Sequence, residues 1–273
     1  MNSVVYVNCS NDEPYDNDRY ICRLKDRIKI KLEGENFIRE LGINVAKVKF
    51  PPNFNKQAYM NNLEICKRYG NKGRISLAPK TFRKMDYYIM TDYQKSLFAY
   101  SVVKSIQLVL RLSKKSIKNS CIAVYDASEY INEEILYELS KECKYIVLLS
   151  RDVLKTRSIG DYITANYGVA PVITNDIEYV FKSADFIITS KSLDKEISKP
   201  LWCIDNKYVP SSSKSVIIND VSYAVPWDIG DLNMSIELLG AILGIMEEKD
   251  IEKSLKYNGI MLDKIMFNNI LSC

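Results

Sequence analysis

The stretch that decides the fold runs from residue 121 to residue 190 and alternates short apolar runs with longer amphipathic segments. It reads CIAVYDA (121–127), SEYINEEILYELSKECK (128–144) and YIVLLS (145–150), and it continues through further helical segments to APVIT (170–174) and DFIITS (185–190). Short apolar runs are typical of buried strands, and the longer segments have the spacing of helices. Strands that alternate with helices predict repeated βαβ units and therefore a parallel sheet.

Six strands are expected in this sheet. The runs above supply four, and PLWCID (200–205) and SVIIND (215–220) are apolar enough to supply two more. The predicted strands are 121–126, 145–150, 170–174, 185–190, 200–205 and 215–220, with helices at 131–142, 158–167 and 177–183. Six parallel strands joined by crossovers predict the order 3-2-1-4-5-6 of a dinucleotide-binding sheet. The fold class is therefore α/β, with a Rossmann-like, doubly wound parallel sheet.

The first 91 residues are expected to form a separate, smaller α+β domain. RLKDRIKIKL (23–32) and VAKVKF (45–50) alternate charged and aliphatic residues, as half-exposed strands do. QAYMNNLEICKRY (57–69) has helical spacing and ends before Gly70. The predicted elements of this domain are strands at 1–8, 23–32, 45–50 and 74–79 and one helix at 57–69.

Helices are predicted on both sides of the Rossmann-like domain, which is placed at 114–232. Residues 92–113 carry a wide apolar stripe at helical spacing and form a linker helix, with Asp92 as its predicted N-cap. Residues 233–273 predict two C-terminal helices, 233–247 and 251–271, that pack on the linker helix.

The composition excludes several kinds of site. The chain of 273 residues contains no histidine, which excludes a histidine general base and any Ser-His or Cys-His nucleophile pair. Its seven cysteines are scattered without a CxxC spacing, which favours reduced thiols and a cytoplasmic protein. The apolar run IELLGAILGIM (236–246) is too short to cross a bilayer, so no transmembrane segment is expected.

Positive charge is concentrated in the first third of the chain. Residues 1–91 hold 17 Lys and Arg against 10 Asp and Glu, a charge of +7, whereas the remaining residues carry −3. A solvated basic face is the simpler interpretation of this excess. The alternative is a surface for an acidic partner, such as RNA or an anionic lipid.

Three segments resemble the NAD(P)-binding domain of shikimate dehydrogenases and glutamyl-tRNA reductases, over residues 92–230. They are KSADFIITS (182–190), SVIINDVSYAVPWDI (215–229) and the pair Ser150-Arg151 after the second predicted strand of the sheet. The resemblance implies NADP(H) as the cofactor. It places Thr189, Ser190 and Val225 on the nicotinamide side, and it places Ser150 and Arg151 at the 2′-phosphate.

The first predicted turn of the sheet departs from that resemblance. Where G-x-G-x-x-G would follow the first strand, the chain has Tyr125-Asp126-Ala127-Ser128-Glu129-Tyr130, without a glycine. Those glycines allow the backbone to approach the diphosphate closely. Asp126 and Glu129 instead put two carboxylates where two phosphate charges would lie, so a dinucleotide would need a displaced pose or a cation between. The alternative is that Ser128 is an N-cap and that both carboxylates only stabilise the helix N-terminus.

Two residues of the N-terminal domain are candidates for catalysis. GRISLAPK (73–80) is similar to a shikimate dehydrogenase segment whose lysine serves in proton transfer, which implies that role for Lys80. Tyr87, in a cluster with Tyr88 and Tyr93, could act as an acid. The alternatives are a solvent-exposed lysine after a strand and a tyrosine that packs in the core.

Three functions from different classes follow. The favoured one is a Rossmann-like protein related to NAD(P)-dependent oxidoreductases that is non-catalytic and has a regulatory or scaffolding role. The second is an active NAD(P)H-dependent dehydrogenase or reductase with an altered phosphate loop. The third is an RNA- or anionic-surface-binding protein that uses its basic N-terminal domain, although nucleic acid is the less favoured partner. The sequence allows a small molecule or nucleotide in the cleft between the domains, allows a homodimer, and fixes no cofactor and no metal.

Overall fold

The computed structural model describes residues 2–10, 12–71, 73–193, 198–210 and 215–267. Within these ranges the chain divides into two compact units. One takes in residues 2–97 and 222–264, and the other takes in residues 98–221 and 265–267. The C-terminal part of the chain therefore belongs largely with the N-terminal segment. The change from the second unit back to the first falls after Val221, before the boundary expected at residue 232.

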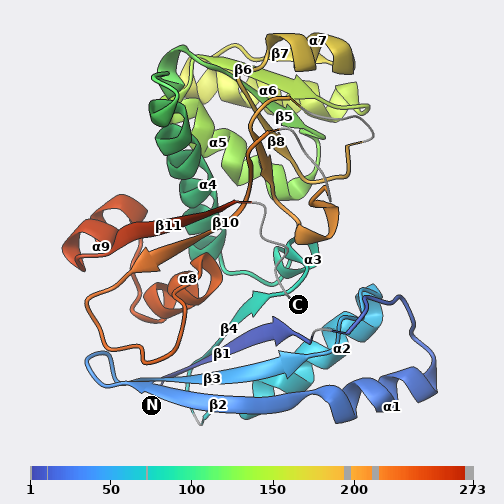
Figure 1. The fold of residues 1–273 in the computed structure, drawn as a ribbon, viewed down its shortest axis with the longest axis vertical. Coiled ribbons are helices and arrows are strands. Elements are labelled where there is room, and N and C mark those ends of the chain that lie inside the picture. The colour runs from blue at the N-terminus through green and yellow to red at the C-terminus, as the bar shows by residue number, and fades with distance from the viewer. Residues whose placement is uncertain (1, 11, 72, 194–197, 211–214, 268–273) are drawn as a thin grey trace. The chain divides into compact units, whose positions relative to one another are not determined.

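The first unit is built on a four-stranded sheet with the order β2-β3-β1-β4 (Figure 1). Its strands are β1 (Asn2–Cys9), β2 (Lys31–Ile38), β3 (Ile43–Phe50) and β4 (Ile75–Lys80). β1 is parallel to β3 and β4, whereas β2 is antiparallel to β3. Alternate residues of β1 and β3, among them Val5, Val48 and Phe50, pack with Tyr59 and Leu63 of α2 (Lys56–Cys66) in one apolar cluster.

Among the described residues, four further α-helices belong to this unit, besides the first turn of α4 (Asp92–Leu112). They are α1 (Tyr20–Lys29), α3 (Arg83–Asp86), α8 (Ile236–Ile245) and α9 (Ile251–Tyr257). α8 begins at the N-cap Ser235, packs against β4 and β1, and is buried along almost its whole length. The helix predicted at 233–247 is therefore present with shorter bounds.

The strand predicted at 23–32 is wrong. Residues Tyr20–Lys29 form α1, and β2 begins only at Lys31. Alternation of charged and aliphatic residues suggested a strand, but the helix places Cys22 and Asp26 one turn apart on its inner face, where Asp26 is fully buried among polar partners. A buried carboxylate needs such hydrogen bonds, and from the helix Asp26 accepts them from the side-chain amides of Asn53 and Asn62.

The C-terminal helix predicted at 251–271 is also wrong beyond its first turns. α9 ends at Tyr257, and Gly259 adopts the left-handed conformation with φ +65°. Residues Met261–Phe267 then form the strand β11. A glycine in this conformation is a common helix terminator, and the sequence Asn258-Gly259 carried that signal.

The larger sheet has the strand order that the sequence predicts. Its order is β11-β10-β9-β8-β5-β6-β7. The strands are β5 (Cys121–Tyr125), β6 (Tyr145–Leu149), β7 (Val172–Thr174), β8 (Phe186–Thr189), β9 (Leu201–Cys203) and β10 (Ile217–Ala224), with β11 at the edge. Every pair from β7 to β10 is parallel. Counted in chain order, the six predicted strands lie in the order 3-2-1-4-5-6, which confirms the Rossmann-like sheet.

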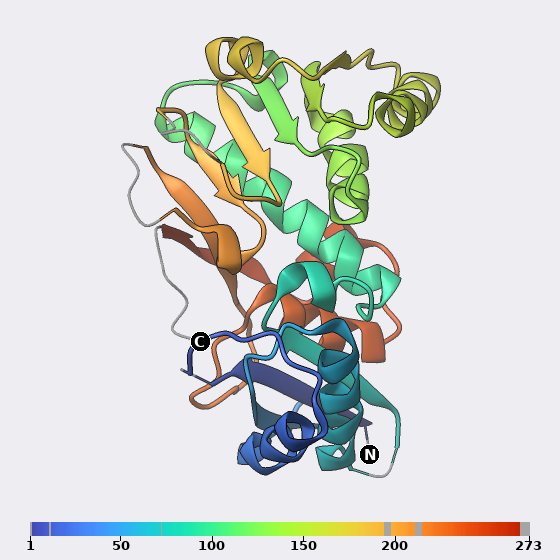
Figure 2. The same cartoon turned by 90° about the vertical axis from the view of Figure 1, so that its right-hand side faces the viewer.

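Helices cover both faces of this sheet. They are α4 (Asp92–Leu112), α5 (Glu133–Glu142), α6 (Val153–Tyr167) and α7 (Ile177–Ser183). On one face, Trp202 donates its indole N–H to Ser105 of α4 at 2.9 Å and packs edge-on against Phe98. On the other face, Ile187 and Leu201 pack with Val180 of α7. Figure 2 shows α4 running along the strands.

Candidate functional site at the carboxyl edge of the larger sheet

The strand register brings three chain segments to one edge of the larger sheet. Tyr125, the last residue of β5, is paired with Leu149 of β6 on one side and with Thr189 of β8 on the other. The residues that follow these three strands therefore meet at the carboxyl edge, where ligands bind in doubly wound sheets.

Two backbone N–H groups of the turn after β5 are hydrogen-bonded within the protein. Asp126 is in the left-handed conformation with φ +60°, which lets the chain turn sharply without a glycine. The N–H of Ala127 donates to the carbonyl of Leu149 at 3.0 Å, and the N–H of Glu129 donates to the carbonyl of Asp126 at 2.9 Å. A diphosphate loop presents such N–H groups to its ligand. In this turn the N–H groups of Ala127 and Glu129 are already hydrogen-bonded to carbonyls of the protein.

Ser128 is not the N-cap that the sequence suggested. A short 3₁₀ turn, Tyr130–Asn132, follows it, and α5 begins only at Glu133. The hydroxyl of Ser128 lies instead 2.9 Å from the hydroxyl of Ser150, so it ties the turn after β5 to the end of β6. The helix N-terminus is complemented by Glu133 and Glu134 in the first turn of α5.

Lys191 lies between the two carboxylates of this turn. Its ammonium group forms an ion pair with Asp126 and a second, at 3.3 Å, with Glu129. The hydrogen bond to Asp126 raises the pKa of Lys191 above its ordinary value. Thr189 fixes the backbone of Lys191, because its hydroxyl donates to the Lys191 carbonyl at 2.8 Å and accepts from the Lys191 N–H at 3.1 Å. The cation that two neighbouring carboxylates require thus comes from the chain itself.

Asn132 closes the same edge from the start of α5. Its side-chain N–H₂ group donates to the carbonyl of Asp126 at 2.8 Å and to the hydroxyl of Ser190 at 3.3 Å, and its side chain is fully buried. Lys191 and Asn132 were both missed by sequence reasoning. The sequence suggested a cation beside Asp126 and Glu129 only as a condition for dinucleotide binding, and it did not indicate Lys191.

The structure brings most of the predicted cofactor residues together. Ser150 is buried and accepts from the N–H of Asp152 at 3.1 Å, which begins α6. Arg151 next to it is exposed. The predicted residues at this edge are Tyr125, Asp126, Ala127, Ser128, Ser150, Arg151, Thr189 and Ser190. Val225 belongs to the other compact unit.

The candidate catalytic residues lie in the first unit. Lys80 is the last residue of β4 and is half-buried. Tyr87 follows α3, is 1% exposed, and has the Lys95 ammonium 5.5 Å from its ring centroid. A ring in that position packs in the core and stacks with a cation.

A buried polar cluster lies directly beyond Lys80. Asp86 is fully buried and accepts hydrogen bonds from the Thr81 N–H at 3.0 Å, from the Thr81 hydroxyl at 2.9 Å and from the Tyr59 hydroxyl. Burial raises the pKa of Asp86 to about 7, although these bonds oppose the shift, and the nearby carboxylate of Glu237 raises it further. Strongly shifted carboxyl groups occur at active sites and in structural networks alike.

Arg83 and Glu237 form a buried ion pair beside this cluster. The guanidinium Nε of Arg83 lies 3.0 Å from a carboxylate oxygen of Glu237, and the two side chains are 1% and 0% exposed. The pair joins α3 to α8. Removing one partner of a buried pair is strongly destabilising because the other charge stays buried.

The described residues contain neither a metal site nor a membrane-spanning helix. No group of three or more cysteine, aspartate or glutamate side chains in the described part of the chain has the arrangement of a metal site. None of the helices described here is long and apolar enough to span a membrane.

Comparisons with known proteins show likeness of fold alone. No protein family and no curated protein sequence matches the chain. Among solved structures, a shikimate dehydrogenase in complex with NADP⁺ is 10% identical, with a TM-score of 0.39 over 74% of this chain and 76% of its own. A quinate dehydrogenase from Corynebacterium glutamicum in complex with NAD is 9% identical, with a TM-score of 0.38 over 77% of this chain and 82% of its own.

An ornithine transcarbamoylase from Giardia lamblia is also similar, at 8% identity and a TM-score of 0.36 over 78% of this chain and 75% of its own. Dehydrogenases and a transcarbamoylase are thus similarly alike to this chain in fold. The similarity of fold therefore does not indicate which reaction, if any, the protein catalyses.

Proposed function

We propose that this chain is a Rossmann-like protein, related in fold to NAD(P)-dependent oxidoreductases, that does not bind a dinucleotide in the usual orientation. We propose further that it is non-catalytic and has a regulatory or scaffolding role. The observation that carries the proposal is the ion pair of Lys191 with Asp126 and Glu129 at the turn after β5.

The site does not fit a diphosphate for three physical reasons. The backbone N–H groups of Ala127 and Glu129 are bonded to carbonyls of the protein. Asp126 and Glu129 would repel a phosphate, and the cation that balances them is a side chain already engaged by both. A diphosphate placed over this turn would therefore have to break these bonds and displace Lys191.

Thermal unfolding with added NADPH or NADH tests the proposal. A ligand present at 100 times its dissociation constant stabilises the native state by about 2.7 kcal/mol, which would raise Tm by several degrees. We expect no change for this protein at coenzyme concentrations that stabilise a shikimate dehydrogenase measured alongside. Stabilisation by NADPH that Arg151→Ala abolishes, and that the matched exposed variant Arg157→Ala leaves intact, would contradict the proposal.

A second candidate function is an NAD(P)H-dependent dehydrogenase or reductase with an altered phosphate loop. Two observations favour it: Arg151 is exposed beside Ser150, and Lys80 is half-buried and directly precedes Thr81, which donates to Asp86, whose pKa is raised to about 7. Oxidation of NADPH in the presence of cyclic keto acids, lost in Lys80→Ala but kept in the exposed variant Lys31→Ala, would support this candidate over the first.

A further inference from the structure

The helix α1 has its apolar face turned toward solvent. Tyr20, Ile21, Leu24 and Ile28 are 75%, 69%, 41% and 72% exposed, whereas the buried residue of α1 is Asp26. At 100° per residue these four side chains fall within about 100° of arc, so they form one stripe along the helix. We call them the α1 stripe. A surface helix of a globular protein normally has the opposite arrangement, with its apolar stripe inward.

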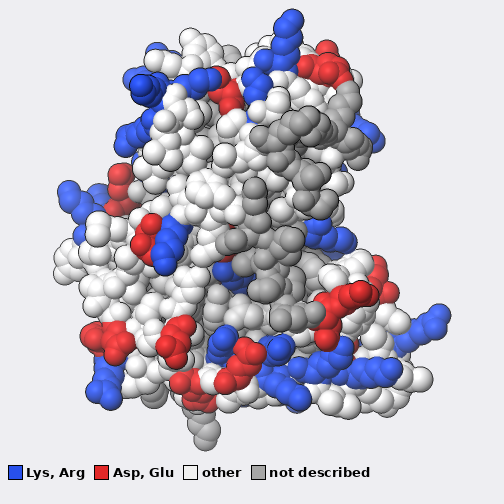
Figure 3. Space-filling model, viewed as in Figure 1, with Lys and Arg blue, Asp and Glu red and all other residues white. Residues whose placement is uncertain are grey.

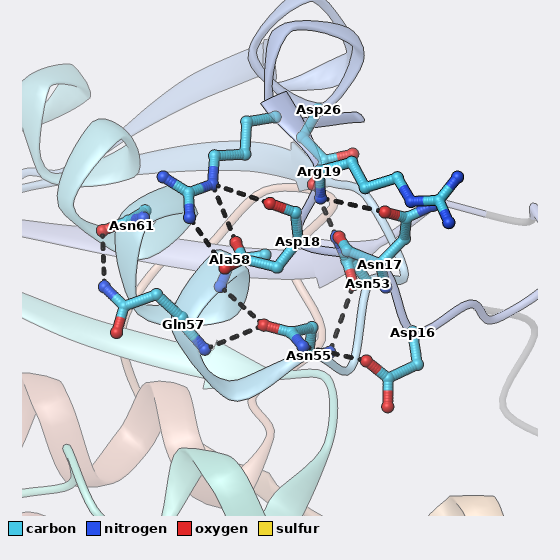
Figure 4. A network of polar contacts seen from close by, with 11 residues as sticks. Asp16, Asn17, Asp18, Arg19, Asp26, Asn53, Asn55, Gln57, Ala58 and Asn61 are labelled. Carbon is cyan, nitrogen blue, oxygen red and sulfur yellow. Dashed lines mark hydrogen bonds and ion pairs between the residues drawn. The ribbon is translucent and has the colours of Figure 1, made fainter. Parts of the chain in front are cut away.

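Asp26 fixes which face of α1 points outward. Its carboxylate accepts from the side-chain amides of Asn53 at 2.8 Å and Asn62 at 3.1 Å, and from the hydroxyl of Tyr15. Asn53 also donates to the carbonyl of Asn17 at 2.7 Å, so the loop before α1 is held by the same side chain (Figure 4). Rotating α1 to bury the stripe would leave these buried polar groups unpaired. The outward orientation of the stripe is therefore built into the fold.

Basic side chains border the α1 stripe on both sides. By the helical angle, Arg23 and Arg27 lie along one border and Lys25 and Lys29 along the other. Arg23 and Lys29 are each paired with an aspartate of the preceding loop, at 2.7 Å and 2.8 Å. For Lys25 and Arg27, the part of the chain that the structure describes offers no carboxylate within ion-pair distance. In Figure 3, Lys and Arg side chains lie over the region that α1 occupies in Figure 1.

A groove of about 370 Å³ continues the stripe toward α2. Arg23 and Arg27 of α1 line one wall, and Ile65 of α2 and Arg68 of the 3₁₀ turn that follows it (Lys67–Tyr69) line the other. Glu64 also lines the groove and is paired with Lys67, while Arg23 is paired with Asp18. The guanidinium groups of Arg27 and Arg68 suit a phosphate, because arginine binds phosphate oxygens with paired N–H groups. Apolar and phosphate-binding surfaces are thus continuous on one side of this unit.

From this arrangement we propose that α1 docks the protein on an anionic lipid surface. The α1 stripe enters the boundary between headgroups and acyl chains, and the bordering lysines and arginines contact lipid phosphates. A second copy of the same helix would set cations against cations. An RNA would leave the four exposed apolar side chains without a partner. The proposal does not depend on the function proposed for the larger sheet.

Co-sedimentation with lipid vesicles tests this docking. We expect the protein to bind vesicles that contain phosphatidylglycerol, to bind pure phosphatidylcholine vesicles much more weakly, and to be released by salt. The double variant Lys25→Gln/Arg27→Gln is expected to bind about 25-fold more weakly, because each cation near such a surface contributes about fivefold. The double variant Ile21→Ser/Ile28→Ser is expected to lose at least about tenfold, because it removes apolar surface from the stripe.

Matched controls separate this surface from general charge and hydrophobicity. Lys253→Gln/Lys256→Gln removes two cations from α9, and Leu154→Ser removes a side chain of α6 that is 79% exposed. Both are expected to bind as the unchanged protein does. All the substituted side chains are at the surface, so each variant should keep its Tm.

Three outcomes would overturn the proposal. One is no binding to phosphatidylglycerol vesicles at low salt. Another is binding that Ile21→Ser/Ile28→Ser leaves unchanged, since charge alone would then explain it. The third is that the protein binds RNA or an acidic peptide but not vesicles, and that the α9 control Lys253→Gln/Lys256→Gln weakens this binding as much as Lys25→Gln/Arg27→Gln does.

Discussion

Lys191 does at the sheet edge what a bound cation would do elsewhere. Two carboxylates a few ångström apart are unfavourable, and a lysine between them removes most of that cost. The sequence revealed the two acids, Asp126 and Glu129, and suggested a cation only as a condition for dinucleotide binding. It could not reveal Lys191 as their partner, because the contact depends on the pairing of β5 with β8, which no local pattern specifies.

A double-mutant cycle measures the coupling of Lys191 with Asp126. Lys191→Met and Asp126→Asn are suitable, since asparagine tolerates the left-handed backbone of residue 126. Lys191 is 45% exposed and Asp126 is 13% exposed, so we expect a coupling of about 1 kcal/mol in urea unfolding. The exposed pair Lys253–Asp250, at 3.4 Å, should give about 0.3 kcal/mol. Equal coupling in the two pairs would show that Lys191 does not organise the turn.

At the scale of elements, the local sequence pattern predicts a strand or helix correctly where apolar residues at regular spacing form its buried face. The strands from β5 to β10 and the helix α7 lie close to where the sequence places them, because continuous apolar runs match buried parallel strands. α1 was predicted wrongly because its inward face is held by a carboxylate and two asparagines instead of aliphatic side chains. A pattern of hydrophobic residues does not predict a helix whose buried face is held by polar hydrogen bonds.

The N-terminus of α4 was also predicted imprecisely, because its cap depends on hydrogen bonds between neighbouring residues. Asp92 was the expected N-cap, but the hydroxyl of Thr91 accepts from the Gln94 N–H at 3.3 Å, while the Gln94 side chain accepts from the Thr91 N–H at 2.9 Å. This reciprocal pair is a capping box, and it places the cap one residue earlier.

α8 and the first turn of α4 are in close contact, which gives a prediction for two glycines of α8. A Cβ on Gly240 would lie 2.9 Å from the side chain of Gln94 and 3.1 Å from its backbone. Gln94 cannot move away easily, because it donates to the carbonyls of Leu77 and Glu237. We expect Gly240→Ala to destabilise the protein by about 1–3 kcal/mol in urea unfolding.

Gly244 of the same helix is the matched control. Its added Cβ would meet only the Thr91 hydroxyl, at 3.8 Å, which is an ordinary contact. Gly244→Ala should therefore stabilise the helix by up to about 1 kcal/mol. A loss of stability in Gly244→Ala as large as that in Gly240→Ala would contradict this account.

At the scale of the whole molecule, the absence of histidine makes the pH dependence of stability unusually informative. No imidazole titrates between pH 5 and 8, where most proteins have several. Asp86 does titrate in that window, because burial raises its pKa from 3.8 to about 7. The folded state therefore binds more protons than the unfolded state between these two values.

Stability should consequently fall as the pH rises from about 4 to about 7 through the ionisation of Asp86. The contribution is fully present below the unfolded pKa and is lost as the pH passes the folded pKa. In Asp86→Asn this fall should disappear. Between about pH 4 and pH 7, the free energy of unfolding of the unchanged protein should therefore fall relative to that of Asp86→Asn by the order of a few kcal/mol. Chemical unfolding at several pH values measures it, with the exposed variant Asp161→Asn as control. Parallel curves for Asp86→Asn and the unchanged protein would contradict the shifted titration.

The ion pairs of Lys191 at the turn after β5 also have a consequence for the lifetime of the protein in a cell. Many coenzyme-dependent enzymes gain stability from their coenzyme, so their lifetime follows its supply. If, as we propose, no coenzyme binds at this turn, the stability of the protein does not depend on the supply of a coenzyme. Its amount would then stay constant while the redox state and nutrition of the cell vary.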